Sequence, residues 1–159
     1  MTFVVGSPPL TFRKINAVAD AAVCVQNYKD TYAASYDEDP RFVSVSKYLS
    51  WLKDRVDEYP DGHVLAYEGE QCIGQLELQV PYGLSTGYIN LYCVTPACRR
   101  QGYGRLLHAY AERYFRSWDA TRIELHVSPN NTAARKFYLS MDYTFVRTEG
   151  RLWRLGKRI

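Results

Sequence analysis

Twelve residues, 94–105, constrain the fold of this chain more than any other stretch, and they read VTPACRRQGYGR. The residues that lead into them, 87–94, are rich in Tyr, Ile, Leu and Val, a composition typical of a strand. After the run, apolar residues recur at offsets of three and four, which predicts an amphipathic helix: Leu107, Tyr110, Ala111, Tyr114 and Trp118. The sequence therefore predicts a strand, a glycine-containing turn and a helix in direct succession.

The predicted turn suits the binding of phosphate groups. Gly102 and Gly104 let the backbone approach an anion without a Cβ in the way, and the first N–H groups of the helix favour negative charge. Arg99, Arg100 and Arg105 add fixed positive charge around this point. We therefore expect a phosphate-binding loop here.

Two known phosphate loops fit this spacing poorly. A Walker loop requires Lys and then Ser or Thr after its last Gly, whereas Arg105 and Leu106 follow Gly104. A dinucleotide-binding fingerprint would need Gly in place of Leu107, although Glu124 stands where its ribose-binding acid is expected. The second reading also leaves too little chain after Gly104 to complete a doubly wound sheet.

A second segment has the same strand, turn and helix order. Residues 122–127 alternate polar and apolar side chains like a strand, and residues 128–130, Ser-Pro-Asn, end it. In the helix that follows, Ala134, Phe137, Tyr138 and Met141 share one face.

The two segments resemble the GNAT superfamily of N-acetyltransferases. Arg-x-x-Gly-x-Gly after Val-x-Pro is similar to the acyl-CoA pyrophosphate loop of that superfamily, and Asn131-x-x-Ala134-x-x-Phe137-Tyr138 is similar to its second cofactor motif. The second motif usually ends in Gly and an aromatic residue, whereas Asp142 precedes Tyr143 here; Asp tolerates a left-handed helix end less readily than Gly. With their strands, the motifs cover residues 87–145.

The resemblance implies an α/β (mixed α+β) chain with the GNAT acyl-CoA N-acyltransferase fold, in which pantetheine lies between two splayed parallel strands. The rest of the sequence agrees, with strands at 10–15, 63–68, 72–80, 144–148 and 152–155, helices at 18–33 and 44–58, and hairpin turns at 69–71 and 149–150. We expect about seven strands and about four helices in a single domain, residues 1–159.

Composition excludes several further classes of protein. The four cysteines have no framework or zinc spacing and the three histidines no ligand spacing, so reduced thiols and no metal site are expected. No secretion signal, membrane span or basic, aromatic-interleaved surface is present, which favours a cytoplasmic protein that binds neither membrane nor nucleic acid.

Charge is divided unevenly along the chain. Residues 1–98 carry a net charge of −5 and residues 99–159 one of +8, which together make the overall +3. A basic C-terminal half suits the phosphates of coenzyme A, and an acidic N-terminal half would attract a cationic amine or is ordinary surface charge.

The resemblance also implies roles for individual residues. The main chain of Cys93 and Val94 would bind pantetheine, and a bulge near Val94 would free an N–H for the acetyl carbonyl. Tyr138 stands where the family has a general acid that protonates the departing thiolate, and Asn131 would bind cofactor, cap its helix, or both. The full set expected to bind acetyl-CoA is Cys93, Val94, Arg99, Arg100, Gln101, Gly102, Tyr103, Gly104, Arg105, Asn131 and Ala134.

The general base is less obvious. Many relatives place a carboxylate or histidine in the strand before the loop, where this chain has Tyr88, Asn90 and Tyr92. Glu77 is the nearest substitute, acting directly or through a water, on a strand face that includes Gln75 and Gln79 and could equally be solvated surface. Four tyrosines of the expected acceptor region form either an aromatic cleft for a cation or ordinary packing: Tyr28, Tyr32, Tyr36 and Tyr82.

These observations predict an N-acetyltransferase that moves the acetyl group of acetyl-CoA to a primary amine of a small molecule, by direct attack in a ternary complex. Acetylation of a protein N-terminus or lysine is the nearest alternative, and a catalytically silent acyl-CoA-binding regulatory module is another. The sequence leaves open the acceptor, the use of longer acyl groups and the oligomeric state, for which a homodimer is one option.

Overall fold

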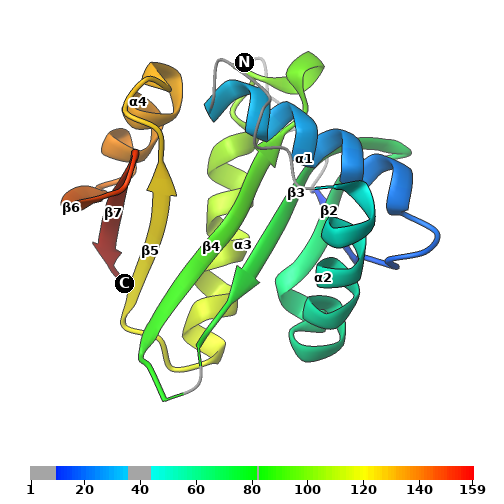
Figure 1. Cartoon of the computed structure of the whole chain (residues 1–159), viewed down its shortest axis with the longest axis horizontal. Helices are drawn as coiled ribbons and strands as arrows, with labels where there is room; N and C mark the ends of the chain where they lie inside the picture. Colours follow the sequence, from blue (N-terminus) through cyan, green and yellow to red (C-terminus); the bar gives the residue numbers. More distant parts are fainter. Residues whose placement is uncertain (1–9, 36–43, 82) are drawn as a thin grey trace, which may run out of the picture.

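The computed structural model describes residues 10–35, 44–81 and 83–159. Its seven strands form one mixed sheet in the order β1-β2-β3-β4-β5-β7-β6 (Figure 1). The strands are β1 (Thr11–Lys14), β2 (His63–Glu68), β3 (Gln71–Gln79), β4 (Thr86–Val94), β5 (Arg122–Val127), β6 (Thr144–Glu149) and β7 (Leu152–Arg158). All neighbours pair antiparallel except β4 and β5, which are parallel.

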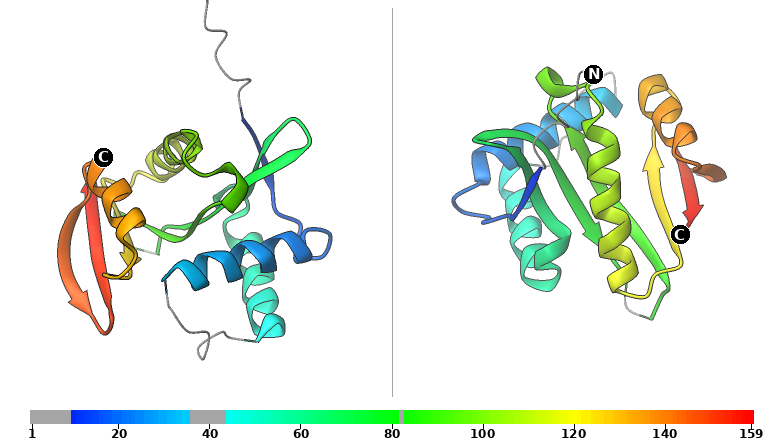
Figure 2. Two further views of the ribbon diagram at one scale, coloured as in Figure 1. Left: turned by 90° about the horizontal axis from the view of Figure 1, so that it is seen from above. Right: turned by 180° about the vertical axis from the view of Figure 1, so that it is seen from behind.

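Helices lie on both faces of the sheet. Figure 2 shows α3 (Tyr103–Ser117) on one face and α1 (Ala21–Ser35) with α2 (Val45–Glu58) on the other. The fourth helix, α4 (Thr132–Ser140), follows β5, and two single-turn 3₁₀ helices, Pro60–Gly62 and Pro96–Cys98, precede β2 and α3. None of the described helices is long and apolar enough to cross a membrane.

The parallel strands β4 and β5 separate along their length. They pair only from Thr86 with Arg122 to Ile89 with Leu125, and among the described residues no strand pairs with the second half of β4 on that side (Figure 1). Beyond Ile89 the two strands enclose the wedge-shaped gap that the resemblance predicts.

Alternation along the strands builds the core. Strand β5 turns its apolar residues toward α3: Ile123, Leu125 and Val127. They belong to one core cluster with Leu107 and Phe115 of that helix. A smaller cluster lies on the opposite face, between α1, α2 and β2, and contains Ile15, Cys24, Tyr48, Leu52 and Leu65. The sheet is therefore covered on both faces at its centre.

The predicted mixed seven-stranded sheet with four helices is confirmed, with small differences. Strand β7 runs to Arg158, three residues beyond the prediction. Trp118, expected on the buried face of the third helix, is the C-cap residue and 47% exposed, because the helix ends at Ser117. Asp142 has the expected left-handed backbone, with a φ of 70°. All four cysteines are free thiols.

Candidate active site

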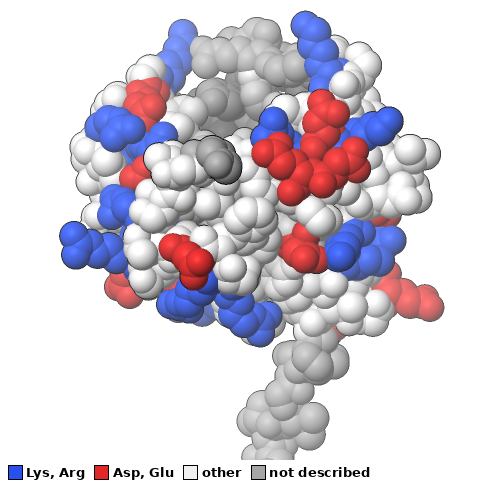
Figure 3. All heavy atoms as spheres, turned by 90° about the horizontal axis from the view of Figure 1, so that it is seen from below, with Lys and Arg blue, Asp and Glu red and all other residues white. Residues whose placement is uncertain are grey.

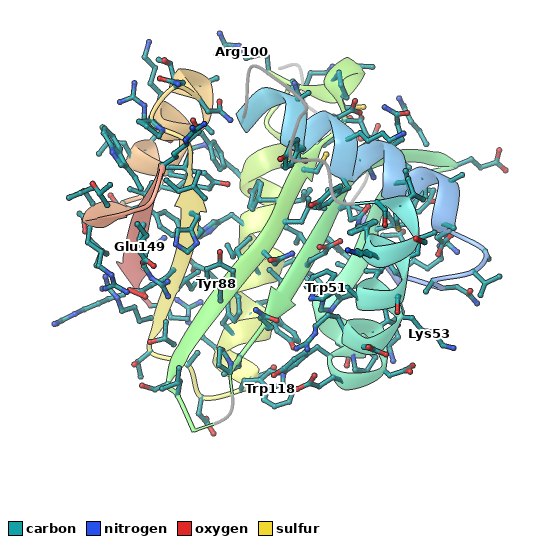
Figure 4. All side chains as sticks on the ribbon, viewed as in Figure 1. Trp51, Lys53, Tyr88, Arg100, Trp118 and Glu149 are labelled. Carbon is teal, nitrogen blue, oxygen red and sulfur yellow. The ribbon has the colours of Figure 1, made fainter. Side chains whose placement is uncertain are left out.

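A cavity of about 460 Å³ opens beside the unpaired half of β4. Its walls come from the end of β4, the loop and first turn of α3, and α4, with one residue from α1. Figure 4 places Arg100 at this end of the molecule and Trp118 at the opposite end. The lining residues are Thr31, Tyr92, Cys93, Val94, Cys98, Arg99, Arg100, Gly102, Tyr103, Gly104, Arg105, Asn131, Ala133, Ala134, Phe137 and Tyr138.

The start of α3 gives the cavity an anion-binding wall. Gly102 is the N-cap residue with a φ of 86°, a backbone conformation that favours glycine, and it has no side chain to occupy the N–H groups of the first turn. Arg99, Arg100 and Arg105 line the same wall, and none of the described lining residues is Asp or Glu. Arg99 is held by a bond from its Nε to the Val94 carbonyl oxygen, at 3.0 Å. This end of the cavity is therefore suited to several phosphate charges.

Gly104 has a packing role that the sequence did not indicate. A Cβ at this position would lie 3.0 Å from Cε2 and 3.1 Å from Cζ of Phe137. The missing side chain thus lets α4 pack closely on the first turn of α3, where Tyr92 also donates a hydrogen bond to the Gly104 carbonyl. Close packing of α4 therefore favours glycine at this position, in addition to the predicted approach of the backbone to an anion.

The main chain of β4 turns polar groups toward the gap. The Thr95 N–H donates to the Ile73 carbonyl oxygen at 2.9 Å, so these two residues form a hydrogen-bonded antiparallel pair. The preceding pair, Gly74 with Val94, is then not hydrogen-bonded, and the Val94 N–H points away from β3. It points to the side on which β5 has separated.

The predicted bulge near Val94 is wrong in position. The register between β3 and β4 shifts where Glu77 pairs with Leu91 and Leu78 pairs with Ile89, which leaves Asn90 as the extra residue. The N–H of Val94 therefore faces the gap because of ladder alternation and the loss of β5, and not because of a bulge beside it.

Tyr138 lies on the cavity wall with only 8% of its surface exposed. Burial, and to a lesser extent the neighbouring Cys93 and Tyr88, raises the pKa of its hydroxyl. Its ring packs edge-on against Tyr92 and Tyr143, with ring centres 5.9 and 5.4 Å away. The phenol is thus held in place and keeps its proton at neutral pH.

Glu77 is not on a solvated face. It is completely buried, because α1 and α2 cover that side of β3, and it does not line the cavity. Its carboxyl accepts hydrogen bonds from Tyr48 at 2.6 Å, from Gln75 at 2.9 Å and from the bulged Asn90 at 3.0 Å. Burial raises the pKa of Glu77, and the three donors oppose that shift. The side-chain amide of Asn27 donates a hydrogen bond to the side-chain oxygen of Gln75 at 3.1 Å, which extends this network to α1.

Ten of the eleven residues predicted to bind cofactor line the cavity, and the exception is Gln101, which bonds to the Ala97 carbonyl instead. Asn131 is confirmed as a helix N-cap, since its side chain accepts from the Ala134 N–H at 3.2 Å. Sequence reasoning missed five lining residues: Thr31, Tyr92, Cys98, Ala133 and Phe137. Phe137 and Ala133 lie inside the second motif and were within reach of that signal, whereas Thr31 is about sixty residues distant from the motifs.

The described tyrosines of the expected acceptor region pack against one another. Tyr28 stacks on Tyr32 and on Tyr48, with ring centres 6.1 and 4.3 Å apart. Tyr36, Tyr82 and the acidic turn at 37–40 lie outside the described residues. Figure 3, seen from the end opposite Arg100, shows Asp and Glu gathered on the side of α2, whose last turns carry Asp54, Asp57 and Glu58. This acidic group is therefore remote from the cavity.

A splayed pair of parallel strands beside a cationic helix start and a buried phenol defines an acyl-CoA-type transferase site. The family comparison gives the same class, because a family model described as "Acetyltransferase (GNAT) family" matches residues 24–143. The chain therefore belongs to the GNAT family of acetyltransferases. No curated protein matches it in sequence.

Solved structures agree with this fold. PaiA N-acetyltransferase from Thermoplasma acidophilum, in complex with coenzyme A, has a TM-score of 0.77 at 15% identity, over 96% of this chain and 100% of that one. Spermidine N-acetyltransferase from Vibrio cholerae, with CoA and spermine, has a TM-score of 0.73 at 17% identity, over 94% and 95%. Ribosomal-protein-alanine N-acetyltransferase from Brucella melitensis has a TM-score of 0.70 at 18% identity, over 94% and 99%.

Proposed function

We propose that this protein transfers the acetyl group of acetyl-CoA to a primary amine of a small molecule, by direct attack of the amine in a ternary complex. The observation that carries the proposal is the cavity, in which the start of α3 and three arginines adjoin the open end of β4 and Tyr138. The similar structures crystallised with coenzyme A, one of them also with spermine, support the same donor and acceptor classes.

Different residues would bind different parts of acetyl-CoA. The first N–H groups of α3, with Arg99, Arg100 and Arg105, would hold the pyrophosphate. The main chain of β4 facing the gap would bind pantetheine and place the Val94 N–H at the acetyl oxygen, where negative charge develops during attack.

Tyr138 would act as the general acid. The neutral amine attacks the thioester carbon, a C–N bond forms, and the C–S bond breaks as the tetrahedral intermediate collapses. The leaving thiolate takes the phenolic proton, which the raised pKa of Tyr138 keeps in place at neutral pH. The nitrogen, positively charged after the attack, then gives one proton to the Tyr138 phenolate, which restores the phenol and leaves the neutral amide. Glu77 stays a hypothesis as the general base, and its burial means that it would need a chain of polar groups or water to reach the amine.

The test is an acceptor panel assayed for release of free thiol from acetyl-CoA. Spermidine, a peptide beginning with alanine and a peptide with an internal lysine separate the three acceptor classes. We expect spermidine or another small amine to give thiol release and an acetylated product of the correct mass. Acetylation of the peptides alone would contradict the small-molecule acceptor, and calorimetric binding of acetyl-CoA without turnover of any amine would point to the silent module. Tight NAD binding with no binding of acetyl-CoA would overturn the donor.

A further inference from the structure

Tyr88 and His126 meet where the paired part of β4 and β5 ends. Tyr88 is opposite Glu124 in the parallel register, and the last pair is Ile89 with Leu125. His126 is therefore the first residue beyond that pair on the face that Tyr88 shares with Glu124. The Tyr88 hydroxyl lies 2.5 Å from Nδ1 of His126, and the ring centres are 5.6 Å apart. The pair closes the narrow end of the gap.

Part of this face is exposed. Both side chains are partly exposed, and no helix in the described part of the chain crosses in front of β5 (Figure 1). The pair does not line the cavity, although negative charge on Tyr88 contributes, after burial and Cys93, to the raised pKa of Tyr138.

The second ring nitrogen of His126 faces a carboxylate. Nε2 lies 3.5 Å from Oε1 of Glu149, and Figure 4 shows Tyr88 and Glu149 on opposite sides of β5. A proton on Nε2 is favoured by that carboxylate, so Nδ1 is left with a lone pair that accepts from the Tyr88 hydroxyl. Charged and titratable groups face this histidine from four strands: Tyr88 on β4, Glu124 on β5, Glu149 with Arg147 on β6, and Arg154 on β7.

Arg154 links the two ends of the arrangement. Its guanidinium binds Glu149 at 3.3 Å and Glu124 at 2.8 Å, and it lies 5.6 Å from the centre of the Tyr88 ring. A cation over the ring favours negative charge on the phenol, and Glu149 favours positive charge on the imidazole against the opposing charges of Arg154 and Arg147. Arg154 and Glu149 therefore act in the direction of proton transfer from Tyr88 to His126.

We propose that His126, acting through the hydroxyl of Tyr88, accepts the proton that the acceptor amine must lose. The inference rests on the proposed function. The ammonium N–H bond breaks as its proton passes to the Tyr88 oxygen, and the Tyr88 O–H bond breaks as its own proton passes to Nδ1 of His126. The amine becomes neutral, Tyr88 is unchanged, and the imidazolium forms beside Glu149. The nitrogen loses a second proton after it has attacked, and that proton restores the Tyr138 phenol that has protonated the thiolate. The imidazolium of His126 then returns its own proton to solvent, so every group of the enzyme ends as it began.

The first test is independent of any acceptor. Nitrogen-detected NMR of the imidazole rings reports which ring nitrogen carries the proton, and the chain has only three histidines, so His126→Asn assigns the signal. We expect the neutral ring of His126 to carry its proton on Nε2. A proton on Nδ1 would leave no acceptor for the Tyr88 hydroxyl and would overturn the relay.

The second test uses the single-turnover rate with whichever amine of the panel is acetylated. Tyr88→Phe and His126→Asn are expected to lower the rate by about 100-fold or more while the affinity for acetyl-CoA is unchanged. Glu149→Gln is expected to lower the rate by a smaller factor, because a neutral amide stabilises the imidazolium formed in the relay less than a carboxylate does.

Two comparisons keep the outcomes separate. Tyr67→Phe removes a phenol from β2, where it accepts a bond from Arg13 at 2.9 Å, and controls for loss of a tyrosine hydroxyl elsewhere in the sheet. Glu77→Gln tests the sequence-based base. A parental single-turnover rate in His126→Asn overturns the relay alone, and a rate that falls in Glu77→Gln but not in His126→Asn assigns the base to Glu77. If the parent protein acetylates no amine at all, the proposed function fails and the relay has no proton to accept.

Discussion

At the scale of single residues, burial decides what each candidate group can do. Tyr138 and Glu77 were both selected as proton-transfer residues, and burial raises the pKa of both. For a phenol that donates, a raised pKa keeps the proton in place until a strong base, such as a thiolate, appears beside it. For a carboxyl that should accept from solvent-accessible amine, complete burial instead removes access. The same physical effect therefore favours the role proposed for Tyr138 and weighs against that of Glu77.

Replacing Tyr138 by Phe keeps the ring and removes only the hydroxyl. We expect the single-turnover rate of acetyl transfer to fall about 100- to 10,000-fold, with acetyl-CoA affinity nearly unchanged. Rapid-mixing kinetics and calorimetry measure the two quantities. A parental single-turnover rate in a correctly folded Tyr138→Phe would make this tyrosine a packing residue and leave the thiolate to be protonated by water.

Glu77 also predicts how stability depends on pH. Because its folded-state pKa is raised, its proton uptake stabilises the folded chain below the ordinary carboxyl pKa, and this stabilisation is lost as the pH rises through the raised value. The glutamine of Glu77→Gln cannot ionise. The free energy of unfolding of the variant, relative to that of the parent, should therefore be higher at pH 7.5 than at pH 4.5. Urea denaturation at the two pH values measures it, and a constant difference would contradict the shift.

At the scale of elements, the position of α4 against α3 shapes the cavity. Phe137 lies against Gly104, and Asn131 and Tyr138 of the same segment reach the cavity wall. The gap between β4 and β5 then exists because their pairing stops at Ile89 and Leu125. We therefore expect donor binding to depend on how closely α4 approaches α3 as well as on the loop that precedes α3.

Gly104→Val should weaken acetyl-CoA binding by about 10-fold, because the added carbons push Phe137 and α4 outward at a cost of about 1 to 3 kcal/mol. Calorimetric titration gives the dissociation constant. The double variant Gly104→Val with Phe137→Leu should recover part of the affinity, since the smaller side chain makes room. If the second substitution recovers nothing, the backbone at Gly104 contacts the pyrophosphate directly.

At the scale of the whole molecule, two buried histidines lie at opposite sides of the sheet. His63 of β2 is held by the Tyr59 carbonyl at 3.0 Å beneath α2, and His108 of α3 contacts the Tyr143 hydroxyl at 2.8 Å. Burial lowers the pKa of each to about 4. Each covered face of the sheet therefore has a neutral imidazole that the unfolded chain would protonate at mildly acidic pH.

We expect the free energy of unfolding to fall as the pH drops from about 6.5 to about 4, by up to about 3 kcal/mol for each histidine. The folded pKa is depressed, so the stabilisation is complete above the unfolded value and is lost between the two. Measuring urea denaturation in Glu77→Gln removes the opposing contribution of that carboxyl. Imidazole NMR should show both rings neutral at pH 5. A ring that is already protonated at that pH would contradict the contribution to stability expected from that histidine.

Local sequence was enough for the elements and for the conformation of the glycine-containing loop before α3. The strand before Pro96, the arginines and the helix after Gly102 are neighbours in the chain, and their φ, ψ and hydrogen-bonding preferences act over a few residues. The same holds for the N-cap of Asn131 and the left-handed Asp142. These features were predicted correctly, because no distant segment is needed to form them.

Only the tertiary structure decided which polar side chains are buried and which meet. A period of two placed Glu77 on a polar face of its strand, but the covering of that face by α1 and α2 depends on segments about thirty to fifty residues away. Tyr88 and His126 are 38 residues apart and share a hydrogen bond through the register of two parallel strands. Sequence patterns specify local conformation, whereas burial and proton transfer depend on which distant surfaces are packed together, and that is determined by the free energy of the whole fold.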